Sequence, residues 1–141
     1  LVDNSFSLKS TPQQTSMERF TRQRTAIYAV VAGAQRPLSP QEILETAQVS
    51  VEGLGLATVY RNLKALLEDG AIEAVQLPGE SPRYEPAGQS HHHHFQCTQC
   101  ARVFDVHACP GDLQGLAPQG FQVQRHELTL YGLCADCAQA A

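Results

Sequence analysis

Two Cys-x-x-Cys pairs constrain the fold of this chain more than any other feature. Cys97 and Cys100 form the first pair, Cys134 and Cys137 form the second, and 33 residues lie between the pairs. Each pair can hold one metal ion from a tight turn, and two pairs complete the tetrahedral four-thiolate arrangement of a structural Zn²⁺ site. We therefore expect the C-terminal end of the chain to be held against the segment that begins at Cys97.

Two other uses of four cysteines are less well supported. An iron–sulfur cluster also takes four thiolates, but the paired spacing favours zinc. A redox-active Cys-x-x-Cys would need a βαβ context, which the pattern lacks. The chain has neither an apolar run long enough to span a bilayer nor a secretory signal, so we expect a soluble, cytoplasmic protein in which disulfides are unusual. The fifth cysteine, Cys109, precedes Pro110 and Gly111 and is expected to be a small loop residue rather than a ligand.

Four consecutive histidines, His91 to His94, lead into the first cysteine pair. On an extended strand the side chains alternate between faces, so His92 and His94 point one way and His91 and His93 the other. A solvated polar strand is the simplest alternative, but acidic groups nearby make metal binding the favoured interpretation. Imidazole with carboxylate suits Zn²⁺, Fe²⁺, Mn²⁺ or Ni²⁺. The groups available to complete one site on each face are Glu85, Asp105, Asp112 and His126.

The first half of the chain predicts three helices. Thr21 is placed to cap a helix that starts at Arg22 and ends near Gly33. The sequence Ser39-Pro40-Gln41-Glu42 is a complete capping box that opens a second helix. A third helix is expected over 57–69, with Gly70 after its end and one apolar face, which comprises Val59, Leu63, Leu66 and Leu67.

Two extended segments, 71–77 and 83–85, follow around a turn at 78–82, and three helices with a hairpin predict a winged helix-turn-helix. We expect an α+β fold. Residues 1–16 are interpreted as a disordered or non-native extension, 17–85 as a winged-helix DNA-binding domain, 86–90 as a hinge and 91–141 as a small α/β domain. In this last domain, extended segments are expected at 92–96, 102–106 and 121–131, with a helical turn near 112–116.

The distribution of charge suggests binding to nucleic acid although the net charge is −4. Several arginines, among them Arg19, Arg22 and Arg24, face only one acidic residue between 17 and 36, and we expect them to contact the DNA backbone or enter the minor groove. On the polar face of the third helix, Tyr60 could contact a thymine methyl or be a half-buried aromatic, and Arg61 could reach a guanine or a phosphate. Thr58 lies on the same face.

These motifs together resemble the ferric uptake regulator (Fur) family of bacterial metal-dependent repressors. The resemblance rests on residues 55–61, 91–100 and 126–134 and covers the chain from Arg19 to Cys137. It implies a homodimer that binds pseudo-palindromic operator DNA, and it leaves a tetramer open. The resemblance further implies that 91–141 is the dimerisation domain. It also implies a regulatory hinge site at Glu85, His92, His94 and Asp105, and a second site at His91, His93, Asp112 and His126.

One departure from the family bears on the metal. Iron and peroxide sensors of the family usually add a histidine close to the position of Pro37, and residues 17–90 contain no histidine. Four nitrogen and oxygen donors suit tetrahedral Zn²⁺, which favours the zinc uptake regulator branch. Against this, zinc sensors often place a cysteine where this chain has Glu85. An Fe²⁺-responsive or peroxide-sensing regulator, with Fe²⁺ or Mn²⁺ at the hinge, is the alternative.

Two functions outside this family are less well supported. A metalloenzyme would need a general base set apart from the ligands, and no residue pattern supplies one, so we expect a protein that is not an enzyme. A metal buffer would explain the histidine run but not the helix-turn-helix.

Overall fold

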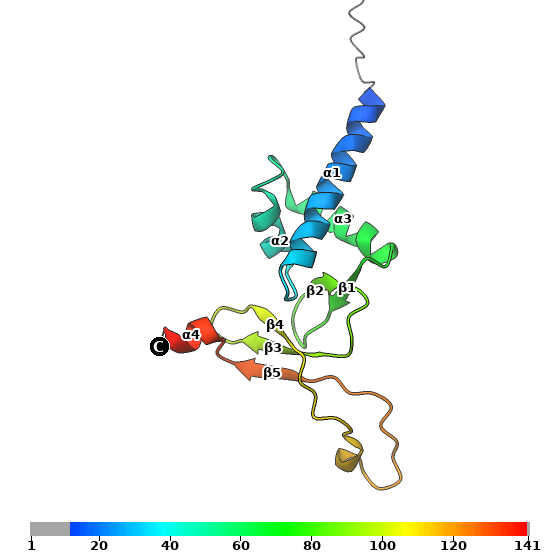
Figure 1. The fold of residues 1–141 in the computed structure, drawn as a ribbon, viewed down its shortest axis with the longest axis vertical. Coiled ribbons are helices and arrows are strands. Elements are labelled where there is room, and N and C mark those ends of the chain that lie inside the picture. Colours follow the sequence, from blue (N-terminus) through cyan, green and yellow to red (C-terminus); the bar gives the residue numbers. More distant parts are fainter. Residues whose placement is uncertain (1–11, 141) are drawn as a thin grey trace, which may run out of the picture.

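Three helices form one end of the molecule in the computed structural model, which describes residues 12–140. They are α1 (Pro12–Gly33), α2 (Pro40–Ala47) and α3 (Leu56–Glu68). Figure 1 shows α2 and α3 against the lower part of α1, whose upper part extends away from the rest of the fold. This arrangement gives the three-helix bundle that the sequence predicts.

The first helix is longer than expected. The prediction that Thr21 caps a helix beginning at Arg22 is wrong, because α1 begins at Pro12 and Thr21 lies inside it. Proline is favourable in the first helical turn, and neither glycine nor proline interrupts the chain between there and Gly33. Residues 12–16, which we assigned to a disordered extension, therefore belong to α1, while 1–11 lie outside the described residues.

The predicted start of α2 and the predicted end of α3 are both confirmed. The Ser39 hydroxyl accepts from the backbone N–H of Glu42, and the Glu42 carboxylate accepts from the backbone N–H of Ser39, both at 3.2 Å. After α3, Gly70 adopts a φ of 72°, and the N–H groups of Gly70 and Ala71 donate to the carbonyls of Leu67 and Leu66. This is a Schellman motif, and it needs a left-handed residue that glycine adopts most readily.

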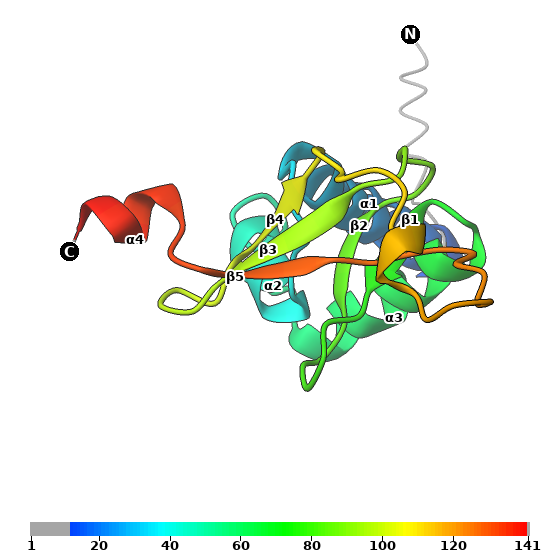
Figure 2. The ribbon, with the colours of Figure 1, turned by 90° about the horizontal axis from the view of Figure 1, so that it is seen from below.

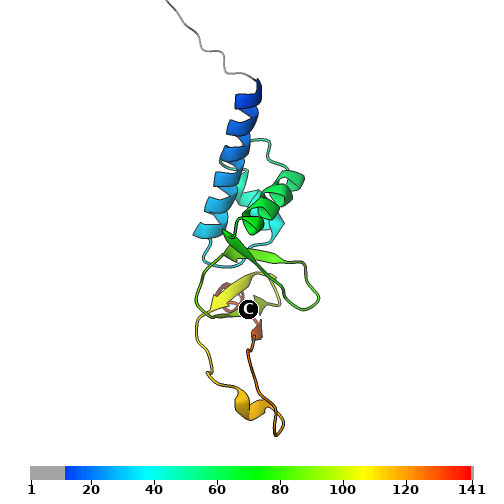
Figure 3. The same cartoon turned by 90° about the vertical axis from the view of Figure 1, so that its right-hand side faces the viewer.

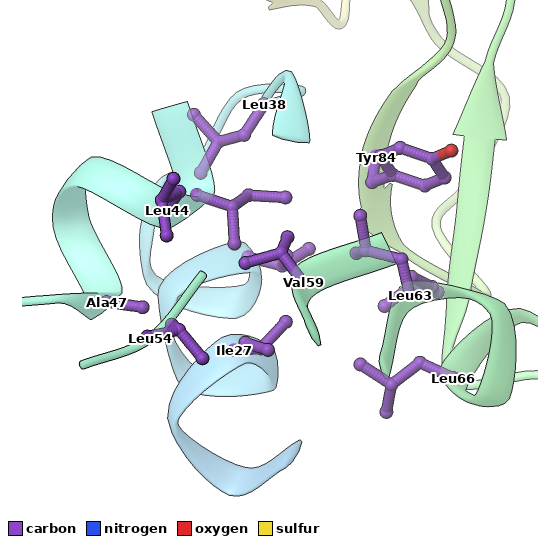
Figure 4. Close-up of a cluster of buried hydrophobic side chains, with 12 residues drawn as sticks. Ile27, Leu38, Leu44, Ala47, Leu54, Val59, Leu63, Leu66 and Tyr84 are labelled. Carbon is purple, nitrogen blue, oxygen red and sulfur yellow. The ribbon is translucent and has the colours of Figure 1, made fainter. Parts of the chain in front are cut away.

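The core of the helical end is one apolar cluster, drawn in Figure 4. Val59, Leu63 and Leu66 of α3 are buried as their spacing predicts, whereas Leu67 lies at the edge with 36% of its surface exposed. The complete set of buried members is Ile27, Val31, Leu38, Ile43, Leu44, Ala47, Leu54, Val59, Leu63, Leu66, Ile72 and Tyr84.

The wing is an antiparallel pair, β1 (Ile72–Val75) and β2 (Arg83–Pro86). Leu38, just before α2, exchanges two backbone hydrogen bonds with Tyr84, of 2.9 and 2.8 Å, and so ties the wing to the helices. Strand β2 ends where the segment 86–90 begins. Glu85 therefore sits at the last part of the winged helix, facing the next domain.

The second domain contains a three-stranded sheet in the order β4-β3-β5. Its strands are β3 (His93–Cys97), β4 (Val103–Val106) and β5 (Thr129–Gly132), with β4 antiparallel and β5 parallel to β3. Figure 2 shows β5 alongside β3, with the C-terminal helix α4 (Ala135–Gln139) projecting beyond the sheet. Only the last part of the extended segment expected at 121–131 forms a strand, and α4 was not predicted.

A long loop connects β4 to β5 and extends away from the helical end, as Figure 3 shows. Its regular structure is limited to the short 3₁₀ helix η1 (Gln114–Leu116), which confirms the predicted turn. The wing packs on the sheet domain through Val75, Leu77 and Val103, and Nε2 of Gln96 donates to Oε1 of Glu80 at 2.8 Å. Within the described part of the chain, none of the helices has the length and apolar character that crossing a bilayer requires.

Candidate metal centres and nucleic-acid interface

The four paired cysteines meet where β3 ends and α4 begins. Their sulfur atoms lie within 4.8 Å of one another, and Sγ of Cys100 lies 3.8 Å from Sγ of Cys134. Zinc–sulfur bonds of about 2.3 Å set tetrahedral edges of about 3.8 Å. All four thiols are free, and Cys97, Cys134 and Cys137 are buried. The separation of the sulfurs fits a four-thiolate zinc site.

The surroundings of the sulfurs favour the thiolate at Cys97 and Cys100 but not at Cys137. The backbone N–H groups of Cys100 and Cys134 donate to Sγ of Cys97 at 3.4 Å, and these bonds lower the pKa of Cys97 to about 6. Nε of Arg102 donates to Sγ of Cys100 at 3.2 Å and lowers its pKa. The pKa of Cys137 is raised to about 12 by its hydrogen bond with Cys134 and by burial. Full ionisation of the set therefore requires a cation among the sulfurs.

A second cluster joins the two domains. Glu85 comes from the end of β2, and His92 directly precedes β3. His94 lies in β3 and pairs with Asp105 of β4 in the strand register. Nε2 of His92 lies 2.9 Å from Oε1 of Glu85, and the other three imidazole–carboxylate separations in the cluster are 3.6 Å. Zinc bonds of about 2.0–2.2 Å to N and O set tetrahedral edges of about 3.3–3.6 Å.

Three buried polar atoms of this hinge cluster have no hydrogen-bond partner among residues 12–140: Oε2 of Glu85, Nε2 of His94 and Oδ1 of Asp105. Leaving such groups unpaired costs about 1–3 kcal/mol each, and more for charged groups. The backbone carbonyl of Ser90 accepts from Nδ1 of His92 at 2.8 Å, which turns Nε2 of that ring toward the carboxylates. The cluster is therefore oriented to receive a cation that would satisfy all of these atoms together.

The pKa values of the hinge cluster show the same electrostatic problem. Burial and the neighbouring Glu85 raise the pKa of Asp105, because two carboxylates share one site. Burial opposes ionisation of Glu85 as well, but contacts with the imidazoles of His94 and His92 outweigh it and lower its pKa. A divalent cation would stabilise both carboxylates in their ionised form.

The third cluster lies on the opposite face of the histidine run and differs from the expected set in one member. It contains His91, His93 and His126, as predicted, with Cys109 in place of Asp112. Asp112 is outside the cluster: its Oδ1 accepts from the backbone N–H of Gln114, the first residue of η1, at 2.8 Å. Cys109, expected to be a loop residue, has its Sγ within 3.3 Å of two imidazole nitrogens.

The sequence held only a faint signal for Cys109. Cys109 is the one cysteine of the five that lies outside the two Cys-x-x-Cys pairs. It is 18 residues from His91 and 17 from His126 along the chain, so no local pattern connects it with them. Cys109 lies close to His93 because β4 runs antiparallel to β3 and ends at Val106, which pairs with His93. His107, in contrast, is exposed, and its ring centroid lies 5.9 Å from that of His92, outside the hinge cluster.

The residues predicted to contact DNA lie on α1 and α3, two of the three helices of the bundle. Tyr60 has 50% of its surface exposed on α3, and Nη2 of the exposed Arg61 donates to the hydroxyl of Thr58 at 3.1 Å. Arg19, Arg22 and Arg24 are exposed on α1, and Arg24 pairs with Asp69 at 3.5 Å. These exposed groups are available to a ligand outside the chain.

Comparison with known proteins agrees with this architecture. Residues 15–131 match the Ferric uptake regulator family. The peroxide operon regulator of Bacillus subtilis is 30% identical over 125 residues, which cover 86% of this chain and 85% of the relative. A zinc-bound manganese uptake regulator has the same fold, with a TM-score of 0.69, 23% identity and coverage of 89% and 99%.

A solved structure of FurB from M. tuberculosis, described as a zinc uptake regulator, matches with a TM-score of 0.50 and 27% identity, and covers 87% of this chain and 98% of its own. These relatives respond to different signals by their names, so the likeness establishes the family and not the metal. With three metal-type clusters placed around a winged helix and a small sheet domain, and with most of its length matched, the chain belongs to the ferric uptake regulator family.

Proposed function

We propose that this chain is a zinc-responsive repressor that binds pseudo-palindromic operator DNA as a homodimer and regulates zinc uptake. Family membership makes it a metal-responsive transcriptional regulator rather than an enzyme. The observation that carries the finer proposal is the hinge cluster, in which Glu85 of the wing faces His92, His94 and Asp105 of the sheet domain. Its four donors suit tetrahedral zinc.

The hinge cluster can link metal binding to the geometry of the DNA-binding domain. Glu85 is the donor from the winged helix, and the other three belong to the sheet domain. When bound, Zn²⁺ would bridge the two domains across 86–90 and so favour one angle between them. In a two-fold dimer this angle sets the spacing of the two recognition helices, which must match two half-sites. A preference of about 3 kcal/mol changes DNA affinity by roughly a hundredfold.

Within residues 12–140, the hinge cluster gathers four donors whose ligand atoms lie within 4.8 Å of one another. Near α2, where iron and peroxide sensors of the family supply a further histidine, this chain has the buried Pro37. Four donors at tetrahedral separations support zinc over the five- or six-coordinate Fe²⁺ or Mn²⁺ that a larger donor set would favour.

The four-cysteine cluster has a structural role in this proposal. Cys97, Cys100, Cys134 and Cys137 would hold one Zn²⁺ with no open position, so that the binding free energy stabilises the sheet domain itself. The exposed arginines of α1, together with Thr58, Tyr60 and Arg61 of α3, would form the DNA-binding surface.

DNA binding as a function of buffered free metal tests the proposal. The probe is a duplex enriched from a random library by the zinc-loaded protein, and the titrations use Zn²⁺ and, under anaerobic conditions, Fe²⁺ and Mn²⁺. We expect affinity to rise by roughly a hundredfold with Zn²⁺ at free concentrations where Fe²⁺ and Mn²⁺ have little effect. A greater response to Fe²⁺ or Mn²⁺ would assign the chain to another branch, and binding independent of metal would contradict the proposal as a whole.

A further inference from the structure

We infer that the cluster opposite the hinge is a zinc site in which the Cys109 thiolate is the fourth ligand, beside His91, His93 and His126. We infer further that this thiolate makes the site select Zn²⁺ over Mn²⁺ and Fe²⁺. The site is separate from the hinge cluster and from the four-cysteine cluster, so the inference does not rest on the zinc-responsive repressor proposed above.

The separations between the donors match a tetrahedron. Nε2 of His91 lies 3.2 Å from Nε2 of His126, and Sγ of Cys109 lies 3.2 Å from Nε2 of His126 and 3.3 Å from Nε2 of His93. Zinc bonds of about 2.0 Å to N and about 2.3 Å to S set edges of about 3.3–3.5 Å. The rings of His91 and His93 meet edge to face with centroids 4.5 Å apart, and those of His93 and His126 stack at 5.0 Å. The ligand atoms of all four residues lie within 4.8 Å of one another.

The protein holds these donors in place. His93 is 2% exposed, and its Nε2 lies 3.3 Å from Sγ of Cys109. The backbone N–H of Leu128 donates to its Nδ1 at 3.2 Å, and zinc binding through Nε2 would replace this bond because the ligating tautomer carries its proton on Nδ1. Sγ of Cys109 also accepts from the backbone N–H of Gly111 at 3.4 Å, which fixes the position of the sulfur. A surface thiol without a role would not be expected to meet two imidazole nitrogens and an N–H group together.

The donor set differs in hardness from that of the hinge. The hinge cluster offers two imidazoles and two carboxylates, whereas this cluster offers three imidazoles and a sulfur and has no carboxylate. A soft thiolate ligand favours Zn²⁺ over Mn²⁺ and Fe²⁺ by its own chemistry, whereas the preference at the hinge depends on the number and tetrahedral placement of its donors. One histidine run therefore serves two sites that select metal in different ways, because alternate residues face opposite sides of the strand.

This zinc would also stabilise the long loop. Cys109 and His126 stand near its two ends, and the segment between them has only η1 as regular structure, with Leu116 and Phe121 largely exposed. A ligand at each end closes a loop that has little packing of its own, and such cross-links reduce the entropy of the open states. Without the metal we expect this segment to move more freely while the sheet stays intact.

The decisive experiment counts metal ions and measures the accessibility of Cys109. The protein is loaded with Zn²⁺ and dialysed against a weak chelator, and zinc is then measured by elemental analysis. We expect three ions per chain in the wild type and two in Cys109→Ala and His126→Ala, in line with the three clusters. Alkylation of Cys109 by iodoacetamide, followed by mass spectrometry, should slow by more than about tenfold when Zn²⁺ is bound but not with Mn²⁺.

Cys109→Asp is the matched variant because it replaces the thiolate by a carboxylate of similar reach. It should keep the third metal ion but lose the discrimination, so that Mn²⁺ displaces Zn²⁺ at a concentration at least roughly tenfold lower than in the wild type. His92→Ala is the control: it should lose the hinge ion and leave the protection of Cys109 unchanged. Three zinc ions in Cys109→Ala, or alkylation at the same rate with and without Zn²⁺, would overturn the inference whatever the outcome of the DNA-binding test.

Discussion

Nε2 of His92 and Oε1 of Glu85 lie 2.9 Å apart although the two residues belong to different domains. Glu85 is in the last strand of the wing, and His92 is next to β3 of the sheet domain. The hinge segment 86–90 separates them along the chain. A metal ion held by both side chains would therefore oppose any change in the angle between the domains.

Replacing His92 by alanine should remove the response of DNA binding to zinc. The variant loses one of four donors, so the roughly hundredfold gain in affinity on adding Zn²⁺ should fall to a fewfold. Its circular dichroism spectrum and unfolding midpoint should match those of the wild type loaded at the four-cysteine site alone. Fluorescence anisotropy of a labelled operator duplex at buffered zinc measures the effect.

His107→Ala is the matched control for this prediction. The ring of His107 lies 5.9 Å from that of His92, but the side chain is exposed and stands outside the hinge cluster. The control should respond to zinc like the wild type. If His92→Ala responded as strongly as its control, the hinge cluster would not be the regulatory site.

Cys97→Ser should unfold the sheet domain and leave the helical domain folded. Structural zinc contributes roughly 10–16 kcal/mol of binding free energy, as much as the whole stability of a typical domain. The apolar core of the helices is a separate cluster and does not depend on the cysteines. Far-UV circular dichroism should retain most of the helical signal, while sedimentation should show loss of the dimer.

Cys109→Ser provides the comparison, since it removes a thiol of the same kind from a different cluster. This variant should stay folded and dimeric, with a much smaller drop in unfolding midpoint than Cys97→Ser, because it loses only the zinc that holds the loop. A dimeric and fully folded Cys97→Ser protein would refute the structural role of the four-cysteine cluster.

Arg102→Gln should accelerate loss of the structural zinc. The Arg102 guanidinium donates to Sγ of Cys100 and also reaches Oδ2 of Asp136 at 3.4 Å, so it offsets the negative charge of a four-thiolate site. Transfer of zinc to a chromogenic chelator should be about 10–100-fold faster than in the wild type. Arg125→Gln is the control because it removes the same charge away from the cysteines, and equal rates in the two variants would contradict the prediction.

Arg61→Ala should weaken operator binding without changing metal content. The side chain is exposed on α3 and its only hydrogen bond within the described residues is to Thr58. If Arg61 contacts a base, its loss should cost about 1–3 kcal/mol of binding free energy and relax specificity at one base pair. If it contacts a phosphate, its loss should weaken binding to all sequences and lower the slope of log affinity against log salt concentration by about one. Titrations at several salt concentrations with operator and unrelated DNA distinguish the two roles, and wild-type affinity for both would exclude Arg61 from the interface.

Local patterns predicted the elements whose determinants lie within a few residues. The capping box at Ser39 and the left-handed Gly70 each depend on neighbours along the chain, and both are present. The alternation of the histidine run follows from the geometry of a strand, and the structure places His92 and His94 on one face and His91 and His93 on the other. The start of α1 was missed because Thr21 satisfies the local preference for a cap without being used as one.

Spacing and periodicity alone predict which four cysteines meet, how the histidines divide between two faces, and the winged helix. The side chains that complete each cluster depend on how distant parts of the chain are folded together. The tertiary structure brought Glu85 across the hinge to His92, and it chose Cys109 over Asp112 as the neighbour of His93 and His126. These choices depend on strand order and on the path of a loop, which bring together residues that no local pattern connects.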